Sequence, residues 1–199
     1  MPPKRCWPTK LICGLTLFSA LIPFAPGSSV PKQDRRWKPY RNPSLGYCLT
    51  YPSRWLKGDA FDGAGFYVET GLKKYSKPLG EIDIAALTSS TDAARPVNVS
   101  LLENLQQHLE GLKTFERAER MQLLEKKQMQ ILGDAALLTK HRYYDPQDRG
   151  AWVDEVIFIS HEQNLFRLEL ECRDDQLERF ESVFNRVVSS FRFDCPASQ

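Results

Sequence analysis

Histidine and cysteine are scarce in this 199-residue chain, which has three of the first and five of the second. The histidines, His108, His141 and His161, are far apart in the sequence. The chain has neither a His-Glu-x-x-His motif nor the closely spaced pairs of cysteines that bind zinc. Those are the spacings by which most zinc sites can be recognised in a sequence. The sequence therefore predicts no metal site.

Motifs for phosphate binding and nucleophilic catalysis are also missing. The stretch 71–80 lacks the Gly-Lys-Ser/Thr ending of a phosphate loop, and Gly63-Ala64-Gly65 precedes a predicted strand where a dinucleotide site needs a helix. No serine lies in a nucleophile-elbow pattern. We therefore predict no catalytic residue, no cofactor-binding residue and no cofactor.

The one long apolar run lies near the start of the chain. Leu11–Phe24 is uncharged, follows three basic residues and precedes the small residues 25–29, which is the layout of a secretory signal peptide. As a helix it would span about 21 Å, less than the ~30 Å hydrocarbon core. Cleavage after Ser29 or Gly27 is therefore favoured over an uncleaved anchor. A lipoprotein signal is disfavoured because Cys13 lies at the front of the run.

Neither sign of charge dominates. The chain has 27 basic and 25 acidic residues, and removal of Lys4, Arg5 and Lys10 with the signal leaves 24 basic residues and a net charge of −1. Nothing in this balance indicates nucleic-acid binding. The remaining length suits one domain. The predicted organisation is a signal peptide (1–29), an extended leader (30–42), one domain (43–195) and a tail (196–199), without membrane insertion after signal removal and as a monomer.

Three cysteines remain after the signal, so one disulfide and one free thiol are expected in an exported protein. Cys172 lies on the apolar side of its predicted strand and is expected to be a buried thiol. Cys48 with Cys195 is the favoured pair, which would tie the first strand to the end of the chain, although the sequence does not decide the pairing.

The end of the chain gives the clearest structural signal. Residues 164–172 alternate, with Phe166, Leu168, Leu170 and Cys172 on one face and Arg167, Glu169 and Glu171 on the other. Apolar residues then recur at helical spacing from Leu177 to Phe191. A strand with one apolar face followed by a helix with an apolar stripe predicts that the helix packs on its own sheet.

Further elements follow from periodicity and turn residues. Ser100-Leu101-Leu102-Glu103 is a capping-box pattern that predicts a helix through Leu112. The stretch 114–132 has residues that favour a helix and an alternation that favours a strand, so it stays undecided. Strands are expected at Gly46–Pro52, Phe66–Thr70, Glu81–Thr88, Ala135–Tyr144 and Ala151–Ser160. The sum is an α+β fold, a mostly antiparallel sheet sandwiched by helices.

Two segments carry a family resemblance. Tyr40-Arg41-Asn42 with Gly46-Tyr47-Cys48-Leu49-Thr50-Tyr51-Pro52-Ser53-Arg54-Trp55, and the closing strand, helix and Ser189-Ser190-Phe191-Arg192-Phe193, resemble the PsbP-like, Mog-type α/β/α sandwich family. That family includes photosystem oxygen-evolution subunits and exported bacterial domains. The resemblance implies a non-catalytic accessory or binding domain. The metal positions of the photosystem members have no matching motif here.

Two short patterns are partly similar to a calcium loop and to an acid–base pair. Asp59, Asp62, Gly63 and Glu69 are similar to a calcium loop, but Glu69 is one position early and Phe61 occupies a ligand position. Asp154 and Glu155 lie beside His141 on a neighbouring predicted strand, which is a pattern for acid–base catalysis. Adjacent strand residues point to opposite faces, so the two carboxylates are not expected to converge on one substrate. Cross-strand charge pairing is the favoured explanation for the polar strand residues, which are His141, Arg142, Arg167, Glu169 and Glu171.

The sequence thus predicts a periplasmic or extracellular binding or accessory domain that contacts an envelope protein, whose identity it does not give. The alternative is a small hydrolase or metal-dependent enzyme with a site in the loops 57–65 and 145–150. The two differ in one observation, because an enzyme needs a concave pocket where acid, base or metal ligands converge.

Overall fold

The computed structural model describes residues 36–58, 63–67, 79–87, 100–162 and 164–195. The predicted signal peptide, the predicted tail and three of the four residues of the calcium-like pattern (Asp59, Asp62 and Glu69) lie outside these ranges. Among the described residues, no helix is both long and apolar enough to span a membrane.

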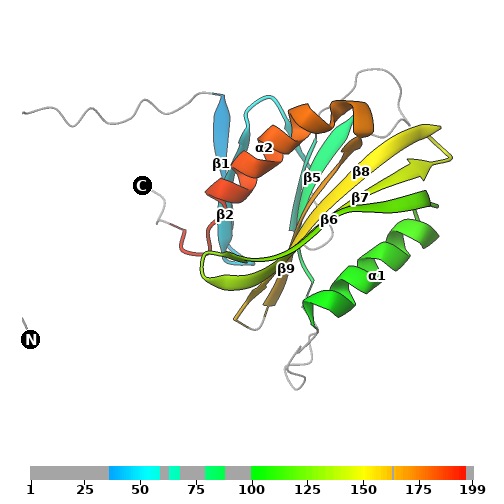
Figure 1. The fold of residues 1–199 in the computed structure, drawn as a ribbon. Helices are drawn as coiled ribbons and strands as arrows, with labels where there is room; N and C mark the ends of the chain where they lie inside the picture. Colours follow the sequence, from blue (N-terminus) through cyan, green and yellow to red (C-terminus); the bar gives the residue numbers. More distant parts are fainter. Residues whose placement is uncertain (1–35, 59–62, 68–78, 88–99, 163, 196–199) are drawn as a thin grey trace, which may run out of the picture. The chain divides into compact units, whose positions relative to one another are not determined.

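The described chain forms a seven-stranded antiparallel sheet, a two-stranded sheet and two helices (Figure 1). The large sheet has the order β3-β4-β5-β9-β8-β7-β6. Its strands are β3 (Leu56–Gly58), β4 (Gly63–Tyr67), β5 (Gly80–Ala86), β6 (Glu119–Ile131), β7 (Asp134–Asp145), β8 (Gly150–His161) and β9 (Asn164–Arg173). The small sheet pairs β1 (Trp37–Asn42) with β2 (Tyr47–Pro52), and the helices are α1 (Leu101–Thr114) and α2 (Leu177–Ser190). The α+β fold predicted from the sequence is confirmed.

Helix α2 packs on one face of the large sheet, as predicted. Phe180, Phe184 and Val187 of α2 are buried in one cluster with Leu168 and Leu170 of β9. Side chains of β5, β8 and the β2 strand complete this main core. Because apolar burial is the largest favourable term in folding, this face supplies most of the stability of the domain.

Helix α1 covers the opposite face (Figure 1). Its N-terminus has the predicted capping box, in which Ser100 Oγ accepts the Glu103 amide and Glu103 Oε2 accepts the Ser100 amide. Leu105 then packs on Leu137 and Phe158 in a second, smaller apolar cluster. The sheet is therefore enclosed by helices on both faces, with the larger core on the α2 side.

The undecided stretch 114–132 is a strand. Strand β6 pairs with β7 over most of its length, with two register shifts, and only Ile131 among its residues is buried. Leu132 and Gly133 connect the two strands with positive φ values of 56° and 91°, the geometry that joins two antiparallel strands by a two-residue turn. An exposed edge strand has a weak apolar pattern, which explains why periodicity did not decide it.

The first hairpin departs from the predicted boundaries. Residues 37–42, placed by the sequence in an extended leader, are strand β1, and Trp37 and Tyr40 pack against the main core. Arg186 of α2 lies over the Trp37 ring at 4.1 Å, which helps to hold the strand in place. Strand β3 was not predicted, and β4 begins at Gly63, before the predicted start at Phe66.

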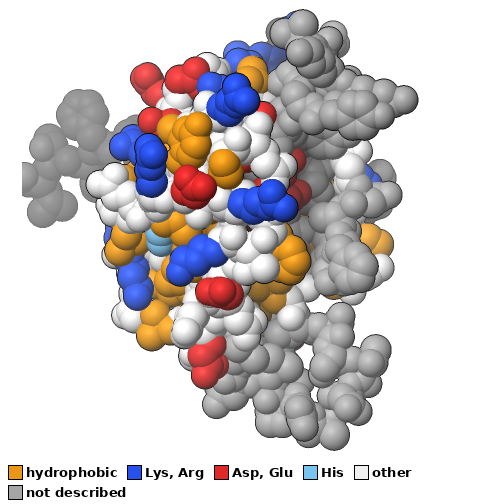
Figure 2. Space-filling model, turned by 90° about the vertical axis from the view of Figure 1, so that its right-hand side faces the viewer, with side chains coloured by type: hydrophobic (Ala, Val, Ile, Leu, Met, Phe, Trp, Pro, Cys, Tyr) orange, Lys and Arg blue, Asp and Glu red, His pale blue; other side chains and the backbone are white. Residues whose placement is uncertain are grey.

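The described surface carries charges of both signs. On the face that Figure 2 shows, acidic and basic side chains lie among apolar ones. This mixture agrees with the near-neutral charge of the sequence after residue 29. Side chains of one charge gather instead on a face of the large sheet.

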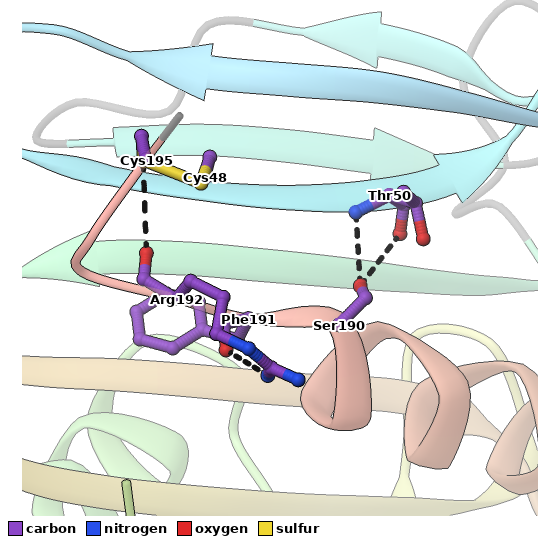
Figure 3. The surroundings of a disulfide bond; sticks show 6 residues. All are labelled: Cys48, Thr50, Ser190, Phe191, Arg192 and Cys195. Atoms are coloured by element: carbon purple, nitrogen blue, oxygen red, sulfur yellow. Dashed lines mark hydrogen bonds between the residues drawn. A yellow bond between two sulfur atoms is a disulfide. The ribbon is translucent and has the colours of Figure 1, made fainter. Parts of the chain in front are cut away.

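A disulfide joins Cys48 of β2 to Cys195, as favoured from the sequence (Figure 3). Cys172 is a buried free thiol. The Cα atoms of the bridged residues are 5.7 Å apart and 147 positions separate them. The backbones of Cys48 and Arg192 also exchange two hydrogen bonds of 2.8 Å. The Thr50 amide donates to Ser190 Oγ at 2.9 Å, so covalent and hydrogen bonds fix the same junction.

Candidate functional site

Strand register gathers acidic side chains on the sheet face beneath α1. Glu81 of β5 is opposite Glu171 of β9, and Glu171 is opposite Asp154 of β8. In the next row Asp83 is opposite Glu169. Because residues two apart on a strand share a face, these five carboxylates form one group. We call Glu81, Asp83, Asp154, Glu169 and Glu171 the acidic face.

A cleft of about 480 Å³ opens between the acidic face and the C-terminal half of α1. The helix contributes Gln107, His108, Gly111 and Leu112 to its lining, and Phe115 lies at the end of the helix with 80% of its surface exposed. Strand β9 contributes Arg167 as well as its two carboxylates. We call this space the α1 cleft; it is acidic on the sheet side and mixed on the helix side.

His108, which lines the cleft, contacts the buried Asp154 beneath it. His108 Nε2 lies 2.9 Å from Asp154 Oδ2, and the two side chains are 6% and 0% exposed. Burial opposes protonation of the imidazole, but the hydrogen bond to Asp154 and the negative charges of Asp154 and Glu169 outweigh it and raise the pKa of His108. The pair therefore favours an imidazolium bonded to a buried carboxylate.

The neighbouring carboxylates are poorly compensated. Burial raises the pKa of Asp83 to about 6, and the charge of Glu169 adds to the effect while Arg167 opposes it. Burial also raises the pKa of Glu169, against the attraction of Arg167, whose Nε lies 3.0 Å from Glu169 Oε2. Burial therefore opposes the charge of both carboxylates, and a cation beside them would favour their ionised form.

Besides Nε of Arg167, whose contact with Glu169 is an ion pair, two buried atoms in this region have no hydrogen-bond partner among the described residues. They are Oδ1 of Asp154 and Nδ1 of His141, which belong to paired positions on β8 and β7. Burial, followed by the charges of His108 and Lys126, lowers the pKa of His141. Glu171 differs from both because it accepts a hydrogen bond from the hydroxyl of Tyr143. Unpaired buried polar atoms are uncommon and call for an explanation.

Three of the side chains have the geometry of metal ligands. One ligand atom from each of His108, Asp154 and Glu169 lies within 4.8 Å of the others. Imidazole nitrogen with two carboxylates is a donor set used by zinc and similar divalent ions. These are the described residues best placed to hold a metal.

Several polar residues that lie close together in the sequence have different partners in the structure. Asp154 faces α1, whereas Glu155 faces α2 and bonds to Lys140 at 3.0 Å, which confirms that the two carboxylates do not converge. Arg167, which was expected to pair across strands, forms its ion pair with Glu169 of the same strand. Arg142 pairs with Asp174 just beyond β9, at 2.8 Å.

The alternative of an enzyme placed its site in the loops 57–65 and 145–150, and the described residues of these loops do not form a catalytic site. Residues 59–62 of the first loop are outside the described ranges. In the second, Asp145 Oδ1 accepts the amides of Gln147 and Asp148. Those bonds stabilise the hairpin turn, which is a structural task for this carboxylate.

Sequence reasoning missed His108 as the central residue of the site. In the helix predicted through Leu112, the residues Leu101, Leu105, Leu109 and Leu112 form an apolar stripe. His108 lies three positions after Leu105, on the same side of the helix. A histidine on the buried side of a helix was therefore visible in the sequence. The pairing of His108 with Asp154 was not visible in the sequence, because Asp154 lies 46 positions later, on a strand.

Comparison with known proteins identifies the fold. No family model matches the chain, and no curated protein matches it in sequence. Cyanobacterial PsbP (CyanoP) from Synechocystis sp. PCC 6803 is similar over 83% of this chain and 97% of its own, with a TM-score of 0.54 and 16% identity. LpqN, involved in cell envelope biogenesis of Mycobacterium tuberculosis, is similar over 78% and 88%, with a TM-score of 0.50 and 14% identity.

The chain therefore has the α/β/α fold of PsbP-like proteins, as the resemblance in its two end segments implied. At these identities the likeness establishes the fold alone. What this chain binds must be argued from its own residues.

Proposed function

We propose that this protein is an exported accessory domain that binds a protein of the cell envelope through the α1 cleft, and that it does not turn over a substrate. The observation that carries this proposal is the group of half-buried and buried carboxylates that line the cleft. One protein of similar fold, LpqN, is involved in cell envelope biogenesis, and a place in the envelope is what we propose for this chain.

Two features support export. The first 29 residues have the composition of a signal peptide. The bridge between Cys48 and Cys195 fits an oxidising compartment, because structural disulfides are rare in the cytosol. Together these two features support the proposed periplasmic or extracellular location.

The chemistry of the cleft favours a basic partner segment. Glu81, Asp83 and Glu116 lie along the cleft with the exposed ring of Phe115 near them. A lysine or arginine side chain entering the cleft would lower the electrostatic cost of the buried carboxylates, and its aliphatic stem would pack on the aromatic ring. The envelope partner is therefore expected to present a basic side chain next to an apolar one.

Site-specific crosslinking tests this proposal. A photo-crosslinking amino acid is placed at Gln107, which is exposed and lines the cleft, and at Ser182, which is exposed on α2 as a matched control. In cells producing the full chain, position 107 should crosslink to one defined envelope protein and position 182 should not. Asp83→Asn combined with Glu116→Gln should weaken that crosslink at least several-fold.

Two results would contradict the proposal. One is the same set of crosslinked proteins from both positions. The other is a chain that keeps its first 29 residues and stays in the cytosol when cells are fractionated. N-terminal sequencing of the fractionated protein reads the cleavage point directly.

The convergence of His108 with carboxylates keeps the hydrolase alternative open, now in the α1 cleft. A panel of ester and phosphoester substrates tests it. Turnover by the purified domain that His108→Gln abolishes would favour the enzyme, and turnover that survives in this variant would point to a contaminant.

A further inference from the structure

We infer that the floor of the α1 cleft is a binding site for a divalent cation of the zinc class, held by His108 from α1, Asp154 from β8 and Glu169 from β9. The site goes beyond partner binding, because it lies deeper than the residues proposed to meet the partner. It also differs from the calcium-like pattern considered from the sequence, with which it shares no residue.

The first support is the arrangement of the three ligand atoms. His108 Nε2 is 2.9 Å from Asp154 Oδ2 and 3.9 Å from Glu169 Oε1, and all three atoms lie within 4.8 Å of one another. Zinc bonds to nitrogen and oxygen are ~2.0–2.2 Å long, so ligand atoms around one ion lie ~3–4 Å apart. Small rotations of the side chains would place a cation between them.

The second support is the buried carboxylate of Asp154. This side chain is fully buried, and its Oδ1 has no hydrogen-bond partner among the described residues. One carboxylate oxygen of Asp154 and one of Glu169 lie within 4.8 Å of each other, so two negative side chains share this space. A bound cation would neutralise both, whereas a single imidazolium cannot.

The surroundings of the three ligands fit a metal site. Arg167 Nε lies 3.0 Å from Glu169 Oε2 and forms an ion pair with this carboxylate. The His108 ring packs edge-on against Phe158, with 6.0 Å between centroids, which limits its rotation. Such outer contacts fix the directions of metal ligands. An open cleft of about 480 Å³ gives an ion a path to the floor.

The donor set selects among cations. One imidazole nitrogen favours zinc over magnesium or calcium, which prefer oxygen ligands alone. Manganese binds the same donors more weakly according to the usual order of affinities. We therefore expect zinc to bind tightly, manganese more weakly, and magnesium and calcium only at far higher concentration.

Calorimetric titration of the chelator-stripped protein, purified from the envelope fraction, provides the test. Zinc should bind at one ion per chain at pH 7.5, and His108→Gln and Glu169→Gln should each weaken binding at least tenfold. His161→Gln is the matched control, because His161 bonds to Asp134 at 2.7 Å outside the cleft. Cobalt should give visible d–d absorption in the wild type that is lost in His108→Gln.

The inference is overturned if the wild type takes up no stoichiometric zinc at micromolar concentration. It is equally overturned if His108→Gln and Glu169→Gln, folded by near-ultraviolet circular dichroism, bind as tightly as the His161→Gln control. Neither result depends on the envelope partner, whose crosslink at position 107 is scored separately. A failed metal site and a failed partner site are thus distinguished.

Discussion

Gly80 of β5 lies directly against the ring of Phe180 in α2. A Cβ atom at position 80 would come 2.8 Å from Cε1 of that ring. Real Cβ contacts are longer, so this glycine lets α2 approach the sheet closely enough to bury the whole phenyl ring, which is 1% exposed.

Replacement of Gly80 by alanine should therefore destabilise the domain. The added methyl group would force the buried ring or the strand to move, and overpacking of this kind costs about 1–3 kcal/mol. Urea unfolding, followed by tryptophan fluorescence, measures the difference.

Gly111→Ala is the matched control. The nearest side-chain atom to a Cβ at position 111 is 4.0 Å away, in Phe115, and the residue lies within α1. Alanine should stabilise this helix by about 0.5–1 kcal/mol. Equal effects of the two substitutions would contradict the close packing of Phe180 on Gly80.

Loss of the disulfide should reduce stability strongly. Cys48→Ser removes a bridge between residues 147 positions apart, and closing so long a loop in the unfolded chain accounts for about 2–5 kcal/mol. Denaturant unfolding of the variant should match that of the reduced wild type. Cys195→Ser should behave in the same way, and a much smaller loss in either variant would show that other contacts hold the junction.

Cys172 should not react with alkylating reagents while the domain is folded. Burial raises the pKa of this thiol to about 12, and the carboxylates of Glu155 and Glu171 add to the shift. Mass spectrometry after treatment with iodoacetamide at pH 8 should find no modification without denaturant and complete modification in guanidinium chloride. Rapid labelling in the native state would contradict the burial of β9.

The carboxyl group of Asp83 should make stability depend on pH. Its pKa is raised from 3.8 to about 6 in the fold, so the folded state binds a proton that the unfolded state releases. This group therefore weakens the fold as pH rises from about 4 to 6, and its effect is full above that range. Asp83→Asn should raise stability by about 1–2 kcal/mol at pH 7.5 and by almost nothing at pH 4.

The measurement is thermal unfolding at the two pH values with a chelator present, so that no bound cation contributes. Asp194→Asn is the control, because Asp194 is exposed near the end of the described chain. A gain in stability that is the same at pH 4 and pH 7.5 would contradict the burial of Asp83 as the cause.

The main core could be predicted from the sequence because its signals are local. The alternation from Phe166 to Cys172 and the stripe from Leu177 to Phe191 each follow from a single period, and their packing follows from adjacency in the chain. The capping box at Ser100 is likewise contained within four residues. Strand β6 lacked such a signal because nearly all its side chains are exposed.

The candidate site could not be predicted, because it depends on register between strands that are distant in sequence. Alternation showed that Glu169 and Glu171 share a face, but it did not show that Asp83 and Asp154 lie beside them. The polar strand residues were explained as cross-strand charge pairs, and the sequence did not show that α1 covers the face of Glu169 and Glu171. The missing information was which helix packs on which face.

The bond between β2 and the residues after α2 bears on when the domain can form. Cys48 pairs with Arg192 and Cys195, so the first hairpin finds these neighbours only after residue 195 has been synthesised. A chain that crosses a membrane N-terminus first would thus lack this closure until residues 192–195 arrive on the far side.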